Sequence, residues 1–222
     1  MPTIEFIGHA SFLITEGDTK LAIDPWCDEN PSTTKTAADI DCNHIVVTHG
    51  HFDHFADVPA IAKRTRAMIH APFEIYEYMT EQGHENAQPI NPGGCVPTDF
   101  GYVAMTPAVH SSSYKGRYMG AACGTVVKIG GKVIYHTGDT ALFSDMKLIG
   151  ERYKPDVLLI SAGNRFTMGP EEAATAAEWI GAKIAVPIHW GTFDALEQSM
   201  DAFKPKGVEV KFMAGGDIWE LD

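Results

Sequence analysis

The feature that most constrains this chain is a run of histidine and aspartate side chains directly after a short apolar segment. His49-Gly50-His51-Phe52-Asp53-His54 follows His44–Thr48, a run too short for a helix and typical of a strand buried on both faces. Two histidines two positions apart project to the same side of an extended strand end, and the following turn brings Asp53 and His54 round from another direction. One short segment can therefore supply ligands to two adjacent metal sites.

Three further residues of the same types stand at the ends of other predicted strands. They are His110, Asp139 and His189, which follow apolar runs at 104–109, 132–135 and 183–188. In α/β architectures the functional groups gather where strands end, so these side chains can converge with the first cluster at one edge of the sheets. The sequence thus predicts a set of seven ligands from four separate segments.

The remaining pattern is one of many short strands with helices between them. We expect strands at 3–7, 11–15, 21–24, 44–48, 104–110, 124–129, 132–135, 156–161, 183–189 and 208–213, and helices at 57–65, 72–82, 170–180 and 193–203. Gly130-Gly131 between two apolar runs predicts a tight hairpin. This order indicates an α/β or α+β protein with two sheets. No linker or low-complexity segment interrupts it, so we expect one domain over residues 1–222.

Composition narrows the function classes. The chain has 17 Lys and Arg against 29 Asp and Glu, a net charge of −12, and no basic run, which disfavours nucleic-acid binding. It starts without a secretory leader and contains no apolar run of membrane-spanning length, so we expect a cytoplasmic protein without a membrane partner. The four cysteines form no C-x-x-C pair and predict no disulfide framework.

In these motifs the sequence resembles the metallo-β-lactamase superfamily, over essentially the whole chain. The resemblance rests on His49-x-His51-x-Asp53-His54 followed in order by His110, Asp139 and His189, and on the segments 8–11, 24–25, 106–113, 136–140, 166–171 and 189–193. These segments are similar to those of a small branch of single-domain hydrolases related to ascorbate-6-phosphate lactonases. The resemblance implies an α+β fold, a four-layer αβ/βα sandwich with two mixed sheets and outer helices.

The resemblance also implies a role for each residue of the set. His49, His51 and His110 would bind a first metal ion, Asp53, His54 and His189 a second, and Asp139 would bridge the two. Asp24 would hydrogen-bond the metal-binding loops without touching metal, and His9 and His136 are expected behind the ligands as well.

The chemistry of these ligands points the same way independently. Five imidazoles and two carboxylates suit divalent ions such as Zn²⁺, with Mn²⁺, Ni²⁺ or Fe²⁺ as alternatives. Two ions about 3.5–4 Å apart can hold a hydroxide between them and polarise a substrate oxygen. We therefore expect a binuclear hydrolase whose bridging hydroxide attacks a small ester, lactone or phosphoester, with Asp53 as the catalytic residue that orients the hydroxide.

Substrate contacts are less constrained by the sequence. Ser111 follows a predicted ligand, Arg165 precedes a helix N-terminus that can receive an anion, and Trp190 stands beside His189, so each is a candidate for contact with a small-molecule substrate. Plain loop or packing roles compete with each of these assignments. His44, His70 and His84 have no partner in the pattern and are expected to be ordinary surface histidines.

Two other functions compete with hydrolysis. The same ligands can hold two irons in a redox protein, although the flavin domain that flavodiiron proteins need is absent from these 222 residues. A non-catalytic metal-binding module on the same fold is the other alternative, although such a decayed site is expected to have lost ligands. A symmetric homo-oligomer is the default expectation for assembly.

Overall fold

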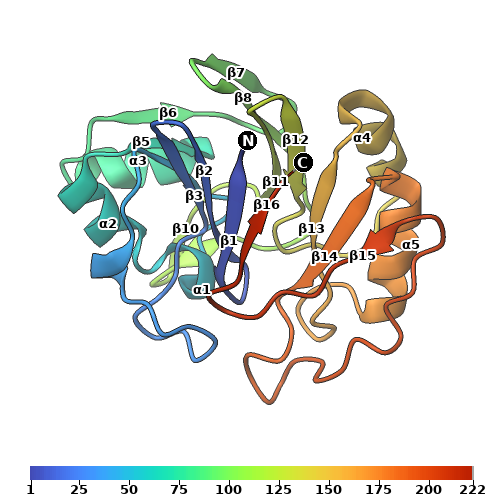
Figure 1. The fold of residues 1–222 in the computed structure, drawn as a ribbon. Helices are drawn as coiled ribbons and strands as arrows, with labels where there is room; N and C mark the ends of the chain where they lie inside the picture. The colour runs from blue at the N-terminus through green and yellow to red at the C-terminus, as the bar shows by residue number, and fades with distance from the viewer. Residues whose placement is uncertain (222) are drawn as a thin grey trace.

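Two large mixed sheets form the centre of the computed structural model, which describes residues 1–221 (Figure 1). The first sheet has the strand order β16-β1-β2-β3-β4-β5-β6. Its strands are β1 (Thr3–Gly8), β2 (Ser11–Glu16), β3 (Thr19–Ile23), β4 (His44–Val46), β5 (Met68–Ala71), β6 (Ala87–Pro89) and β16 (Ile218–Glu220). Pairing is antiparallel from β16 to β3 and parallel from β3 to β6.

The second sheet repeats this arrangement, with the order β15-β14-β13-β12-β11-β8-β7. Its strands are β7 (Cys95–Thr98), β8 (Gly101–Pro107), β11 (Cys123–Ile129), β12 (Lys132–His136), β13 (Val157–Ser161), β14 (Ile184–Ile188) and β15 (Glu209–Val210). It is antiparallel from β7 to β12 and parallel from β12 to β15. A small hairpin of β9 (Ser113–Tyr114) and β10 (Arg117–Tyr118) lies apart from both sheets.

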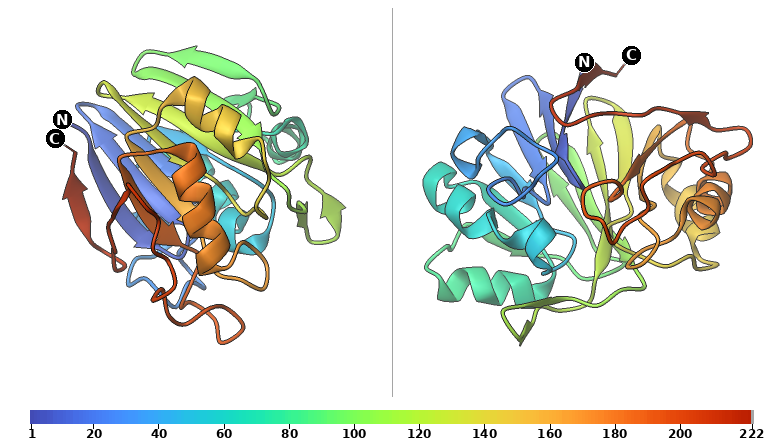
Figure 2. Two further views of the ribbon diagram at one scale, coloured as in Figure 1. Left: turned by 90° about the vertical axis from the view of Figure 1, so that its right-hand side faces the viewer. Right: turned by 90° about the horizontal axis from the view of Figure 1, so that it is seen from below.

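Helices cover the outer face of each sheet. The first sheet carries α1 (Phe52–Phe55), α2 (Val58–Thr65), α3 (Phe73–Glu81) and the 3₁₀ turn η1 (Ala37–Asp39), and the second carries α4 (Met146–Tyr153) and α5 (Pro170–Ile180), on opposite sides of the molecule (Figures 1 and 2). One apolar core lies between the two sheets and one lies beneath the helices of each side. The predicted α+β fold, a four-layer αβ/βα sandwich, is confirmed.

Local signals in the sequence account for several of these elements. Gly130 and Gly131 both have positive φ, at 56° and 78°, which is the backbone that a tight turn between β11 and β12 requires. Helix α5 begins at Pro170 and ends before Gly181, whose left-handed backbone caps it. These two predictions from the sequence are correct.

The C-terminal part departs from the prediction. Residues 193–203 form turns and bends rather than a helix, because the backbone N–H of Glu197 donates to the carbonyl of Gly163 and the carbonyl of Glu197 accepts from Gly191. These long-range bonds use groups that a helix would pair internally. The strand expected at 208–213 is only Glu209–Val210, and the closing strand β16 was not predicted.

Three other differences concern the site and its surroundings. The strand expected at 104–110 ends at Pro107, so His110 lies in a loop, and the helices α1 and α4 were not predicted. The prediction that His70 is a surface residue is wrong. His70 is 1% exposed in β5, where its Nε2 lies 3.3 Å from Nδ1 of His44.

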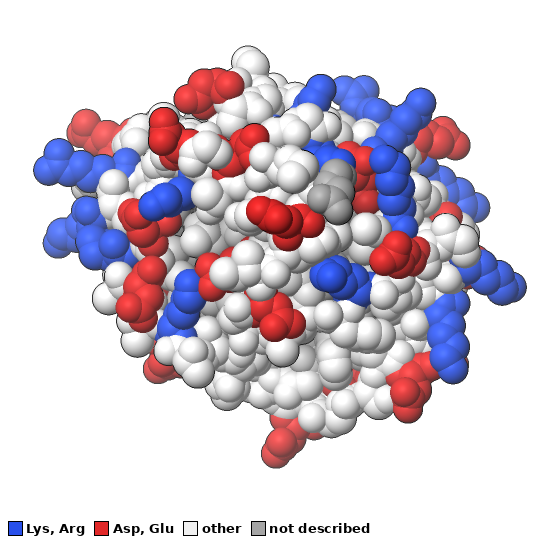
Figure 3. Space-filling view, in the orientation of Figure 1, with Lys and Arg blue, Asp and Glu red and all other residues white. Residues whose placement is uncertain are grey.

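The surface of the molecule carries both signs of charge. Acidic and basic side chains are mixed on the face shown in Figure 3, and uncharged surface predominates in its lower middle part. Among residues 1–221, none of the helices combines the length and the apolar character needed to cross a membrane.

Candidate metal centre

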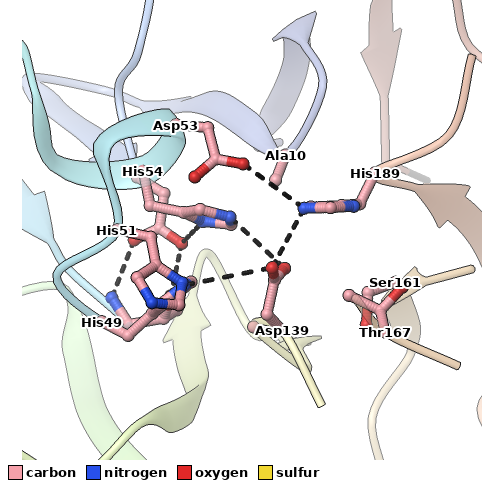
Figure 4. Close-up of polar contacts among 12 residues, drawn as sticks. Ala10, His49, His51, Asp53, His54, Asp139, Ser161, Thr167 and His189 are labelled. Atoms are coloured by element: carbon pink, nitrogen blue, oxygen red, sulfur yellow. Dashed lines mark hydrogen bonds and ion pairs between the residues drawn. The ribbon is translucent and has the colours of Figure 1, made fainter. Parts of the chain in front are cut away.

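The histidine and aspartate side chains singled out in the sequence converge at the edge where the parallel strands of both sheets end. The loop after β4 and the short helix α1 carry four of them, and the other three come from the loops after β8, β12 and β14. Figure 4 shows side chains from both sheets pointing toward one another across this edge. The members of the set are His49, His51, Asp53, His54, His110, Asp139 and His189.

Three histidines form a first cluster. Nδ1 of His51 lies 3.1 Å from Nε2 of His49 and 3.2 Å from Nε2 of His110. Nitrogen ligands at about 2.0–2.1 Å from one tetrahedral ion lie roughly 3.3 Å from each other, so this spacing suits a shared zinc-like ion. The three side chains form one of the candidate ligand groups in the described part of the chain.

A second cluster lies beside the first. Nε2 of His189 is 3.0 Å from Oδ2 of Asp139 and 3.5 Å from Oδ2 of Asp53. Nε2 of His54 is 3.3 Å from Oδ1 of Asp139. Asp139 also faces the first cluster, because its Oδ2 is 3.6 Å from Nε2 of His110 and 4.0 Å from Nε2 of His49. The carboxylate of Asp139 therefore stands between the two groups of nitrogens (Figure 4).

Several of these atoms are buried without a hydrogen-bond partner. Nε2 of His54, Nε2 of His189 and Oδ1 of Asp139 are in this state, although they lie close to one another. A buried polar atom without a partner costs about 1–3 kcal/mol, and natural folds rarely retain several together. Their convergence fits divalent metal ions, which would be bound by these same lone pairs.

The electrostatics of the cluster agree with that use. Burial favours the neutral acid of Asp139, but the neighbouring His189 and His54 outweigh it and hold its pKa well below its ordinary value. Burial also opposes ionisation of Asp53, but hydrogen bonds from His189 and His9 outweigh it and lower the pKa of this carboxyl as well. Burial lowers the pKa of His49, His51 and His110. Ionised carboxylates and neutral imidazoles are the states in which these groups bind metal.

The pKa values of the other two histidines, His54 and His189, are raised. Burial lowers the pKa of His54 and His189, but the Asp139 carboxylate more than compensates, raising that of His189 to about 9 and that of His54 well above its ordinary value. The neighbouring carboxylates thus favour a positive charge at these two imidazoles. A bound divalent cation would supply that charge in place of the protons.

Asp24 holds this arrangement from behind. Its carboxylate accepts hydrogen bonds from the backbone N–H of Thr48 at 2.7 Å and from the Thr48 hydroxyl at 2.5 Å. It also accepts one from Nδ1–H of His54 at 2.8 Å, which leaves Nε2 of that ring as the lone-pair nitrogen facing Asp139. Such carboxylate–histidine pairs fix the orientation and tautomer of metal-binding rings.

His9 reaches the second cluster, whereas His136 does not. Nε2 of His9 lies 3.2 Å from Oδ2 of Asp53, and its Nδ1 lies 2.9 Å from the hydroxyl of Thr192. Burial lowers the pKa of His9 to about 3. A neutral His9 can therefore donate from Nε2 to Asp53 while Nδ1 accepts from Thr192.

His136 shapes the loop that carries Asp139. Its Nε2–H donates to the carbonyl of Ala10 at 2.9 Å, and its Nδ1 accepts the N–H of Gly138 at 3.0 Å. Gly138 has a φ of 60°, and a Cβ there would lie 2.3 Å from the carbonyl oxygen of Cys123. The chain thus needs glycine at this position to bring Asp139 into the cluster.

The candidate substrate contacts lie at different places. Ser111 borders the centre, with its hydroxyl 3.2 Å from Nε2 of His51. Arg165 is exposed, and its guanidinium lies 5.6 Å from the ring of Phe166. Trp190 lines a different hollow, where its indole N–H donates to the carbonyl of Pro187 and its ring contacts Phe212.

Sequence reasoning missed the aromatic wall of the site. A cavity of about 450 Å³ opens beside the two clusters. Its walls include Phe52, Phe166, Phe193 and Ala195, together with His51, Asp53, His110, Ser111, Asp139 and His189. Phe52, Phe166 and Phe193 lie in three of the segments on which the resemblance rests, 49–54, 166–171 and 189–193, but nothing in the sequence indicated that their rings share one wall.

Comparison with known proteins gives a consistent family. A model of the beta-lactamase superfamily domain matches residues 19–190. A UPF0173 metal-dependent hydrolase from Shouchella clausii is 46% identical over 206 residues, 90% of each chain. One from Geobacillus thermodenitrificans is 44% identical over 223 residues, 97% of this chain and 98% of that protein.

A solved structure gives the same answer. Igni18, described as a novel metallo hydrolase from the hyperthermophilic archaeon Ignicoccus hospitalis, superposes with a TM-score of 0.88. It is 32% identical, and the match covers 100% of this chain and 99% of that one. Sequence, fold and the two facing ligand clusters agree: the chain belongs to the β-lactamase superfamily, within the group of UPF0173 metal-dependent hydrolases.

Proposed function

We propose that this metal-dependent hydrolase is binuclear and cleaves a small ester, lactone or phosphoester. The observation that carries the proposal is the position of Asp139, whose two carboxylate oxygens lie between the nitrogens of two separate histidine clusters. One oxygen is buried without a hydrogen-bond partner. A carboxylate in this position suits a bridge between two cations better than a ligand to one.

The chain's own residues divide between the two ions. His49, His51 and His110 would hold one ion, Asp53, His54 and His189 would hold the other, and Asp139 would contact both. The mixed nitrogen and oxygen ligands favour Zn²⁺, with Mn²⁺, Ni²⁺ or Fe²⁺ as alternatives set by supply. Bound ions of this kind supply a nucleophilic hydroxide near neutral pH and polarise the oxygen of the substrate.

Asp53 is the residue we assign to proton handling. Its carboxylate lines the cavity, and its low pKa keeps it ionised and able to accept a hydrogen bond from the attacking water. His9 holds the Oδ2 side of this carboxylate in place. For an ester, the new bond joins the water oxygen to the acyl carbon, the bond from that carbon to the alkoxy oxygen breaks, and the alkoxide receives a water proton.

The test is elemental analysis of protein purified without a metal-chelating tag, combined with assays on lactones, carboxylic esters, phosphodiesters and phosphomonoesters. We expect two zinc or manganese ions per chain, and hydrolysis that a chelator stops and added metal restores. One ion per chain at full activity would contradict the binuclear site. Two irons with a visible absorption band and no hydrolysis would instead favour the redox alternative.

A further inference from the structure

The cavity beside the candidate metal centre has a largely aromatic wall. Two large apolar side chains, Phe52 and Phe166, border it while remaining 51% and 52% exposed to solvent. Exposed aromatic rings around a concave site next to reactive groups are typical of ligand contacts. The volume of about 450 Å³ suits a small molecule.

The third ring makes part of this wall rigid. Phe193 lies 5.8 Å from the ring of Trp26, 5.6 Å from that of His9 and 6.4 Å from that of Phe52, measured between ring centroids. Trp26 is buried and also packs edge-on against Phe52 at 5.7 Å. Phe52 and Phe193 are therefore held by the core behind them, whereas Phe166 projects from the loop before α5.

The wall of the cavity outside the candidate metal ligands offers no positively charged side chain from residues 1–221 to an anionic part of a substrate. Apart from the candidate metal ligands, the side chains on its wall are uncharged: Phe52, Ser111, Phe166, Phe193 and Ala195. Phosphate sites are normally built from Arg, Lys or helix N-termini. Arg165 is exposed beside Phe166, and the whole chain carries a charge of −12. A phosphomonoester, with about −1.5 to −2 charge at pH 7, would have only the metal ions of the proposed function as partners, without the Arg or Lys that normally lines a phosphate site.

We propose that this aromatic wall, formed by Phe52, Phe166 and Phe193, binds an uncharged apolar or aryl substituent of a carboxylic ester. The inference rests on the proposed function, since it selects among the substrates of that same centre. The ester accepts water at its acyl carbon, the acyl–oxygen bond breaks, and an acid and an alcohol leave. The rings contribute by removing apolar substrate surface from water beside the reacting bond.

The first arm of the test compares substrates of the metal-loaded protein, by titrating the acid released from the esters and by assaying the inorganic phosphate released from the phosphate ester. Methyl phenylacetate and benzyl acetate carry one aryl group, methyl acetate carries none, and phenyl phosphate carries an aryl group and a dianion. We expect kcat/KM for the two aryl esters to exceed that for methyl acetate by about tenfold or more, with phenyl phosphate the poorest. Equal rates for the three esters, or preference for phenyl phosphate, would overturn the inference.

The second arm uses variants of exposed residues. Phe166→Ala should lower kcat/KM for methyl phenylacetate by about tenfold and leave methyl acetate within about twofold. The matched control is Phe212→Ala, because Phe212 is 55% exposed and lines the separate hollow around Trp190. Equal losses in Phe166→Ala and Phe212→Ala would contradict a specific role for the wall.

A binding experiment separates this inference from the proposed function. Benzylacetone is an uncharged aryl ketone that cannot be hydrolysed, and calorimetry can follow its binding to the metal-loaded and the metal-free protein. Binding that weakens about tenfold in Phe166→Ala supports the aromatic wall even when no ester is cleaved, in which case only the proposed esterase chemistry fails. Ester hydrolysis without benzylacetone binding would overturn the wall and leave the hydrolase standing.

Discussion

The two sheets contribute to the candidate metal centre in different ways. The first supplies four ligand-type side chains from six consecutive positions, on the loop after β4 and on α1. The second supplies three, one from each of three loops separated along the chain. The local geometry of the first group follows from one strand end and one short helix, whereas that of the second depends on how the whole sheet pairs.

The register of the parallel strands explains how ligands from separate loops of the second sheet come close together. Strands β12, β13 and β14 are parallel neighbours, with Tyr135 beside Leu158 and Leu158 beside Ala185. Their carboxyl ends therefore meet at one edge, and the loops that follow bring Asp139 and His189 within 3.0 Å of each other. The comparison shows that residues 49–54 contribute side chains to both clusters of potential ligands. The carboxylate of Asp139, far away in the chain, lies between these clusters.

The largest effect should come from removing the carboxylate of Asp139. Asp139→Asn replaces the carboxylate that we propose as a bridge with an amide of the same shape. It should lower both metal affinity and hydrolysis by more than about a hundredfold, beyond the loss typical for a supporting residue. Metal content per chain and kcat/KM measure this. Asp201→Asn, at an exposed aspartate, is the control. Full activity in metal-free Asp139→Asn protein would refute the proposed mechanism.

A smaller effect is expected for Asp24, which hydrogen-bonds the candidate ligand His54. Asp24→Asn places an amide where Thr48 and His54 both donate, so the orientation of His54 should loosen. We expect metal affinity to fall about 10–100-fold with the fold retained. Competition with a chelating dye measures the affinity, and Asp18→Asn in the exposed turn between β2 and β3 is the matched change. Unchanged affinity would remove Asp24 from the site.

A substitution at His9 tests whether its contact with Asp53 is needed for activity. His9 has a φ of 59°, and asparagine adopts this left-handed backbone more readily than most residues. His9→Asn should therefore keep the loop while losing the contact with Asp53, lowering kcat about tenfold with metal content unchanged. His84→Asn, at a histidine bonded to the carbonyl of Ala67, is the comparison variant. A rate within about twofold of the parent would assign His9 to packing alone.

The smallest effect at neutral pH concerns a histidine of the first sheet outside the site. Burial, with a smaller contribution from His44, lowers the pKa of His70 from 6.5 to about 4. The unfolded chain therefore takes up this proton first, so the stabilising contribution is complete above about pH 6.5 and declines as the pH falls toward 4, by at most about 3 kcal/mol.

His70→Leu should thus change the free energy of unfolding at pH 7 by less than about 1.5 kcal/mol and flatten its decline at acid pH. Urea unfolding at pH 7 and pH 4.5 measures both quantities. Met68→Leu in the same strand keeps His70 and should retain the parent's pH dependence. An equally steep decline in His70→Leu would show that other groups govern acid stability.

Much of the fold could be predicted because its signals are local. Strand β4 and the histidine-rich motif, the Gly130-Gly131 turn and the Pro170 start of α5 each depend on residues near one another in sequence. The segment 193–203 was mispredicted because its apolar spacing imitates a helix, while its backbone bonds to Gly163 far away in the chain. Strand β16 was missed because only pairing with β1 stabilises so short a segment.

The sequence by itself determined the types of side chain that could form the centre and their placement at strand ends, because side-chain chemistry and strand periodicity are local properties. Only the tertiary structure decided which of them face one another. It brought Asp139 between the two histidine clusters, set His9 against Asp53 and turned His136 away to the backbone of Ala10. It also gathered Phe52, Phe166 and Phe193 into one wall. These juxtapositions arise from sheet register and loop packing, which depend on contacts between residues far apart in the chain.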